Sequence, residues 1–202
     1  GMTLADVDPF KIPLPDSVFG IAETFSDSWD EITYRAVLDY RALDDVMVYA
    51  SFATGFISGG FTETCSSIAT CQPFNEETNW NYETGLKGQF FDGRLQSNLA
   101  VFFTRYDDLI RSQVLPFTDA FGITTQETVN VNAGETEAKG VELEMQFVPR
   151  EDIILDLQVG YLDHDYVEFD LDTDGDGITE DLSDLEVPFS PKWKIGGGVT
   201  FE

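Results

Sequence analysis

An acidic stretch at residues 172–181, DTDGDGITED, has the residue types and spacing of a calcium-binding loop. Alternate oxygen ligands there can converge on one hard cation, and Gly177 permits the sharp turn that such a loop needs. The candidate ligands are Asp172, Asp174, Asp176, the backbone carbonyl of Ile178, and Glu180. Ser183 stands where an EF-hand requires a bidentate glutamate. The sequence therefore predicts a weak, structural Ca²⁺ site, with a solvated acidic turn as the alternative, and suggests no other cofactor.

Cys65 and Cys71 are the only cysteines of the chain, and both lie in the polar segment TCSSIATCQP. Two cysteines in one short loop predict a disulfide formed in an oxidising compartment. Two exposed free thiols are the alternative. A metal site is disfavoured, because no further cysteine or histidine lies nearby and His164 is the only histidine.

Enzymatic chemistry finds little support in the sequence. Glu142 and Glu144 share one face of a predicted strand but have no nucleophile or histidine partner. The glycines at 196–198 lie within a predicted strand and not between a strand and a helix, so they do not form a phosphate-binding loop. We therefore expect no enzymatic activity.

The elements that must position these residues are β-strands. Period-2 alternation of apolar and polar residues recurs in seven segments, at 32–40, 46–53, 82–90, 95–104, 141–147, 155–161 and 193–201. No stretch of helical period competes with them. The pattern predicts an all-β protein, an antiparallel up-and-down meander of about seven strands.

Short and long connections alternate along this meander. The short ones, at 41–45, 91–93 and 149–152, are turns rich in Asp, Gly or Pro; the long loops lie at about 57–78, 115–128 and 169–189. In an up-and-down topology all short turns then fall at one end of the sheet and all long loops at the other, as in outer-membrane barrels. We expect an N-terminal loop segment at 1–28 and a partial β-barrel domain at 29–202.

Each predicted strand has one apolar and one polar face. The sequence does not say which face is wet, because the apolar face would be the core of a soluble sandwich and the lipid-facing surface of a membrane barrel. In a barrel the polar face lines the lumen. The lumen-facing candidates are Arg35, Tyr49, Glu83, Lys87, Gln89, Glu142 and Glu144.

Composition limits the partners. Eleven Lys and Arg residues against 38 Asp and Glu give a formal net charge of −27, so we expect no nucleic-acid partner. Aromatic residues make up 13% of the 202 residues, which argues for a folded chain. No run of about 18 apolar residues is present, so no transmembrane helix is predicted.

Three motifs follow one another along the chain: Y-A-S-x-x-x-G-F-x-S-G-G-F at 49–61, N-Y-E-x-G-x-K at 81–87 and N-A-G-x-x-x-x-x-G-V-E-L-E at 132–144. In these motifs and their order the chain resembles the barrel of TonB-dependent outer-membrane receptors. The resemblance extends over about residues 28–201. It implies an internal segment of a large transmembrane barrel in the bacterial outer membrane, in contact with membrane lipid. It also implies a receptor that binds and imports a scarce nutrient such as a ferric siderophore, or another small-molecule or metal-chelate ligand.

The sequence departs from that family in what it lacks. The resemblance implies that the family's plug domain and terminal strands are not represented in these residues, because seven strands cannot close a barrel of about 22 strands. Contact with TonB would then occur only through the missing plug region. The alternative hypothesis is a secreted, soluble β-sandwich binding module with a calcium-stiffened loop.

Overall fold

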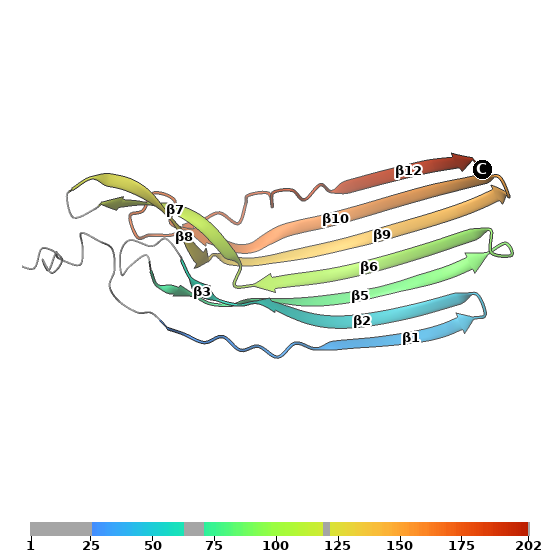
Figure 1. The fold of residues 1–202 in the computed structure, drawn as a ribbon, viewed down its shortest axis with the longest axis horizontal. Helices are drawn as coiled ribbons and strands as arrows, with labels where there is room; N and C mark the ends of the chain where they lie inside the picture. Colours follow the sequence, from blue (N-terminus) through green and yellow to red (C-terminus); the bar gives the residue numbers. More distant parts are fainter. Residues whose placement is uncertain (1–25, 63–70, 119–121, 202) are drawn as a thin grey trace, which may run out of the picture.

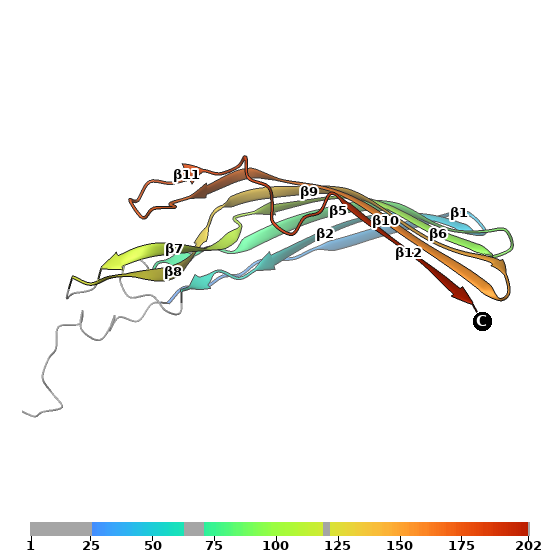
Figure 2. The ribbon, with the colours of Figure 1, turned by 90° about the horizontal axis from the view of Figure 1, so that it is seen from above.

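The computed structural model describes residues 26–62, 71–118 and 122–201, and its main feature is one curved antiparallel sheet (Figures 1 and 2). Seven long strands and the short β11 form this eight-stranded sheet, and each long strand pairs with the next long strand along the chain. The predicted all-β meander is confirmed. The long strands are β1 (Arg35–Leu43), β2 (Val46–Ile57), β5 (Glu77–Phe90), β6 (Leu95–Asp107), β9 (Gly134–Arg150), β10 (Ile153–Leu171) and β12 (Trp193–Phe201).

The two ends of the sheet differ in the length of their connections. Tight turns join β1 to β2, β5 to β6 and β9 to β10 at one end, and the long connections all lie at the other end (Figure 1). We call the second end the loop end. Its connections carry short strands: β3 (Gly60–Phe61), β4 (Pro73–Phe74), β7 (Ile110–Thr118), β8 (Thr124–Asn132) and β11 (Glu180–Asp181).

The connection expected to be a long loop at about 115–128 contains part of a β-hairpin. β7 pairs with β8 over nine residue pairs, from Ile110 with Asn132 to Thr118 with Thr124. Strands β9 and β10 are also longer than their apolar alternation predicts, because they continue toward the loop end through polar residues. Residues 1–25 of the expected N-terminal loop segment lie outside the described residues.

Strand pairing sorts the side chains into two faces, because directly paired residues of antiparallel strands point to the same side. Along one such row, Val48 pairs with Leu86, Leu86 with Leu99, and Leu99 with Leu143. This apolar face is uncovered: Val101 is 46% exposed and Tyr82 47%. Both other sheets in the described part are two-stranded hairpins and do not form a second layer over it. The soluble β-sandwich alternative is therefore not supported.

A small core lies at the loop end, where the long strands leave the sheet. Leu109 and Ala133 are each 2% exposed, and Phe169 is 8% exposed. Backbone N–H groups of Leu109 and Ala133 donate to the carbonyls of Gly134 and Leu109, each at 2.8 Å, and the N–H of Asp170 donates to Ala133 O at 2.9 Å. These bonds fix the base of the β7–β8 hairpin to β10. No helix among the described residues is long and apolar enough to cross a membrane.

Candidate functional site

The second face of the sheet is polar, and all seven lumen-facing candidates lie on it. One row crosses the sheet from Lys87 to Asn98, Glu144 and Gln158, each paired with the next. The other candidates occupy equivalent positions. The pairs that place them are Arg35 with Ala53, Tyr49 with Gly85, Ser51 with Glu83, Gln89 with Gln96, and Ala100 with Glu142.

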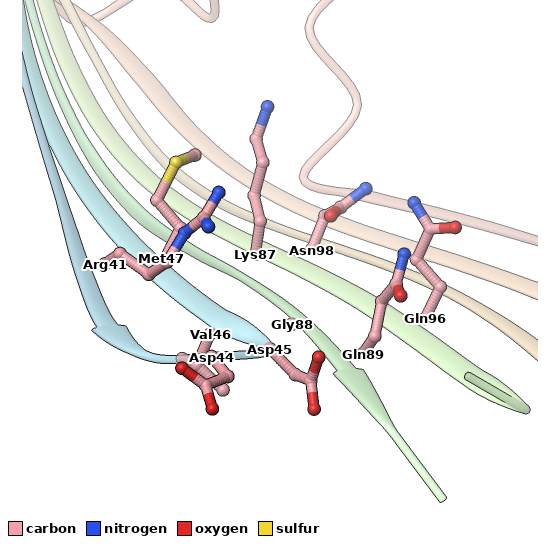
Figure 3. Close-up of a pocket in the computed structure, with 10 residues that line it drawn as sticks. All are labelled: Arg41, Asp44, Asp45, Val46, Met47, Lys87, Gly88, Gln89, Gln96 and Asn98. Atoms are coloured by element: carbon pink, nitrogen blue, oxygen red, sulfur yellow. The ribbon is translucent and has the colours of Figure 1, made fainter. Parts of the chain in front are cut away.

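Three hollows follow this polar face near the short turns. The first, of about 320 Å³, is lined by residues that include Lys87, Gln96 and Asn98, which stand on the same side of the sheet (Figure 3). The second, of about 200 Å³, shares Gln96 and Asn98 with the first and reaches Glu144 and Gln158. The third, of about 150 Å³, shares Glu144 and Gln158 with the second. The polar wall is thus hollowed across most of its width.

Side-chain amides line much of these hollows, and the sequence analysis identified only Gln89 among them. Gln96, Asn98, Gln146 and Gln158 are the others. They occupy the polar positions of the same alternating strands, so the alternation that found Glu144 was the signal for them too. Side-chain amides both donate and accept hydrogen bonds without carrying charge. The polar face therefore offers uncharged donors and acceptors to a ligand or to water.

Tyr49 is the centre of an interacting group on the polar wall. Its hydroxyl donates a hydrogen bond to Glu83 Oε1 at 2.6 Å, and the ammonium of Lys87 lies 5.4 Å from the centre of its ring. Three candidates that the sequence placed on one face therefore also contact one another. The group holds the ring in one position against the wall.

Glycines make room for two aromatic rings on this face. A Cβ at Gly85 would lie 2.5 Å from Tyr49 Cε1, and a Cβ at Gly140 would lie 2.3 Å from Phe102 Cζ. Gly134 has a φ of +130°, and a Cβ there would lie 2.0 Å from the carbonyl oxygen of Glu168. The glycines of the 81–87 and 132–144 motifs therefore have a steric basis in ring packing and in close approach of the backbone.

Asn132, the first residue of the third motif, joins three segments at the loop end. Its Nδ2 donates to the carbonyls of Asn75 and Asp108, at 3.0 and 2.9 Å, and its Oδ1 accepts from the N–H of Asn75 at 2.7 Å. This asparagine therefore ties the connection after β4 to both ends of the β7–β8 hairpin.

The acidic stretch forms the tip of the β10–β11 hairpin, between Leu171 and Glu180. Carboxylate oxygens of Asp172, Asp174 and Asp176 lie within 4.8 Å of one another. Asp172 accepts from the N–H groups of Gly175 and Gly177, at 2.6 and 2.9 Å, which closes the loop. Three of the predicted ligands are thus brought together.

The remaining calcium-ligand candidates, Glu180 and Ile178, make hydrogen bonds to other residues of the loop. Glu180 Oε2 accepts from the N–H and the hydroxyl of Thr173, both at 2.9 Å, and Ile178 donates its N–H to Asp176 Oδ1 at 2.8 Å. Beyond the tip, hydrogen bonds from the side chain and the backbone N–H of Ser183 hold the pKa of the Asp181 carboxyl below its ordinary value. Ca²⁺ binding by this loop stays a prediction.

Cys71 is buried at 1% exposure and is not a free thiol. Cys65 lies outside the described residues. The Cys65–Cys71 pairing therefore stays a prediction.

Similarity to known proteins agrees with this two-faced sheet. Residues 8–202 match the family model described as TonB dependent receptor-like, beta-barrel. The chain belongs to this family. It is thus part of an outer-membrane β-barrel, a class of protein in which apolar strand faces meet lipid and polar faces line the lumen.

Curated relatives of the receptor segment include two bacterial receptors. The ferric-pyoverdine 358 receptor of Pseudomonas putida is 29% identical over 179 residues, which are 84% of this chain and 20% of that protein. The pesticin receptor of Yersinia enterocolitica is 30% identical over 118 residues, 58% of this chain and 16% of that protein. The segment therefore spans at most about a fifth of these two relatives' length.

Solved structures show the same fold. The ferric yersiniabactin uptake receptor FyuA from Yersinia pestis matches with a TM-score of 0.59 and 22% identity, over 82% of this chain and 22% of its own. The ferric-catecholate import receptor Fiu from E. coli matches with a TM-score of 0.57 and 15% identity, over 84% of this chain and 22% of its own.

Proposed function

We propose that this segment is part of the wall of a receptor that binds a ferric siderophore and imports it across the outer membrane. The observation that carries the proposal is the division of the sheet into an exposed apolar face and a hollowed polar face. Such a sheet suits a barrel that separates lipid from a wet lumen large enough for a small metal chelate. The names of its relatives, receptors for ferric pyoverdine and ferric yersiniabactin among them, support that ligand class.

Import against a concentration gradient requires energy, and in this family TonB supplies it through the plug region. The residues of the segment would contribute the lumen wall and the loop end. Its role is binding and passage, without chemical conversion of the ligand.

The test is uptake of radiolabelled iron by an iron-starved strain that lacks its own receptors and expresses the full-length receptor carrying this segment. Ferric pyoverdine, ferric yersiniabactin and a ferric catecholate are the probes, because they are named for the similar receptors. We expect uptake with at least one of them, abolished when TonB is deleted. Failure to take up any ferric chelate, with the receptor folded in the outer membrane, would contradict the proposal.

We also propose that the acidic tip binds Ca²⁺ weakly and thereby stiffens the β10–β11 hairpin. The convergence of the Asp172, Asp174 and Asp176 carboxylates supports this role. Like-charged carboxylates held this close repel one another, and a divalent cation between them would remove that repulsion.

A further inference from the structure

A hollow lies at the loop end between the short strand β4 and the β7–β8 hairpin. Its volume is about 320 Å³, and residues of all three strands line it. It shares no lining residue with the three hollows of the polar face, which lie near the short turns. A hollow of this size suits a small molecule or one part of a larger ligand.

The lining of this loop-end hollow combines apolar side chains with side-chain amides. Its main members are Phe74, Leu115, Val129, Gln113, Asn130 and Asn132. No charged side chain is among the described residues that line it. Such a lining can pack against a ligand and form hydrogen bonds with it, but it supplies no counter-charge.

The three amides differ in what they can offer. Asn132 already uses its Nδ2 and Oδ1 on neighbouring segments. Asn130 Oδ1 accepts from the hydroxyl of Ser112 at 2.7 Å, which fixes the amide and leaves Nδ2 as a donor. Gln113 Oε1 is buried and has no hydrogen-bond partner. A buried acceptor without a partner is costly, and a ligand N–H group that reaches it would remove this cost.

Buried carboxylates stand beside the hollow. Glu127 is 6% exposed and pairs with Leu115 across the hairpin. Glu77 is 8% exposed, and its Oε2 accepts from the N–H of Ile110 at 2.9 Å, next to the end of the hairpin that carries Asn132. An anion in the hollow would therefore meet negative groups at two points of its border.

The hairpin has one cation to set against them. Arg111 is the only cationic residue of 110–132, and it pairs with Val131. Its Nη1 donates to the carbonyl of Ile110 at 2.9 Å, and the side chain does not line the hollow. An anionic group that enters the hollow would lose water without gaining a counter-charge, whereas an uncharged polar group would lose much less.

We propose that the loop-end hollow binds part of the ferric chelate and selects uncharged tris-hydroxamates over anionic tris-catecholates. This inference rests on the proposed import of ferric siderophores. Three hydroxamates carry one negative charge each and neutralise Fe³⁺, whereas three catecholates leave the complex with an excess of negative charge. In a peptide-linked hydroxamate, an amide N–H would donate to Gln113 Oε1 and a carbonyl would accept from Asn130 Nδ2.

The test is equilibrium binding of two chelates to the full-length receptor, purified in mild detergent. Ferrichrome is the uncharged tris-hydroxamate, and ferric enterobactin is the anionic tris-catecholate. We expect the wild type to bind ferrichrome more tightly. Gln113→Lys adds an ammonium group and should shift the ratio of the two dissociation constants by up to about fivefold toward ferric enterobactin. Gln113→Glu, which nearly keeps the shape of glutamine, should shift the ratio in the opposite direction.

Gln126→Lys is the matched control. Gln126 is an exposed residue of the same hairpin that pairs with Pro116 and does not line the hollow, so its replacement should leave the ratio unchanged. Tighter binding of ferric enterobactin by the wild type would overturn the proposal, as would an equal shift in Gln113→Lys and Gln126→Lys. Failure of the proposed function would be distinct, because the receptor would then bind neither chelate and take up no ferric siderophore.

Discussion

The Tyr49 hydroxyl donates a 2.6 Å hydrogen bond to Glu83 Oε1 between neighbouring strands, on the polar face of the sheet. The ring occupies the space that a side chain at Gly85 would need, and Lys87 lies over it. Three positions of the 81–87 motif, Glu83, Gly85 and Lys87, therefore act on one tyrosine of the preceding strand. The motif is explained by packing on the wall and requires no bound ligand.

Replacement of Gly85 by alanine should destabilise the barrel by about 1–3 kcal/mol, the usual cost of overpacking. Its Cβ would lie 2.5 Å from both Leu99 O and Tyr49 Cε1, so the ring must leave Glu83. Urea unfolding of the full receptor in detergent measures the loss. Gly160→Ala is the control, because its Cβ would meet nothing nearer than 3.9 Å. Equal stability of the two variants would refute this account of how the Tyr49 ring packs against Gly85.

Arginine at neighbouring positions of β9 should have opposite outcomes. Leu143→Arg puts a charge on the lipid face and should cost about 2–4 kcal/mol near the bilayer midplane, whereas Glu144→Arg puts it in the lumen and should cost little. Folding into vesicles at a series of urea concentrations gives both values. If Glu144→Arg proved the more damaging, the assignment of the faces would have to be reversed.

The acidic tip should bind Ca²⁺ with a dissociation constant on the order of 10⁻⁴–10⁻³ M, as extracellular sites with few ligands do. Asp174→Asn with Asp176→Asn removes two of three converging carboxylates and should abolish the calorimetric heat. Asp184→Asn with Glu186→Gln removes the same charge outside the cluster and should preserve it. Identical heats from both variants would favour the solvated acidic turn.

The Cys65–Cys71 disulfide should form in receptor isolated from the outer membrane. Mass spectrometry of the non-reduced peptide should show the loss of two hydrogens relative to the reduced form. In a Cys65→Ser variant the buried Cys71 should react with alkylating reagents only after unfolding, since it is 1% exposed. Alkylation of both cysteines in the native wild-type receptor would contradict the prediction.

Much of the sheet was predictable because one face of each strand must be apolar. Leu99, Leu143 and Val159 pair across β6, β9 and β10, and their alternation with polar neighbours is visible in the sequence. The β7–β8 hairpin was not predicted, because its strands mix polar and apolar residues without a strict period and include Pro116.

For the candidate site, the sequence could predict only which face of the sheet each residue occupies. Alternation placed Tyr49 and Glu83 on one side of the sheet, but their hydrogen bond depends on register between strands separated by the β3–β4 connection. The ion pairs of Arg105 with Asp107 and Glu137 were not predicted, for the same reason. Arg105 and Glu137 meet through the pairing of β6 with β9, although 32 positions separate them in the sequence.

The central claim, that this sheet separates lipid from a wet lumen, is tested most directly by spin labels placed singly at residues 141–147 of the full receptor in vesicles. Oxygen concentrates in lipid, so its collision rate with each label should alternate along β9, high at Val141, Leu143, Met145 and Phe147 and low at Glu142, Glu144 and Gln146. A profile without this period, or with the two sets exchanged, would contradict the account.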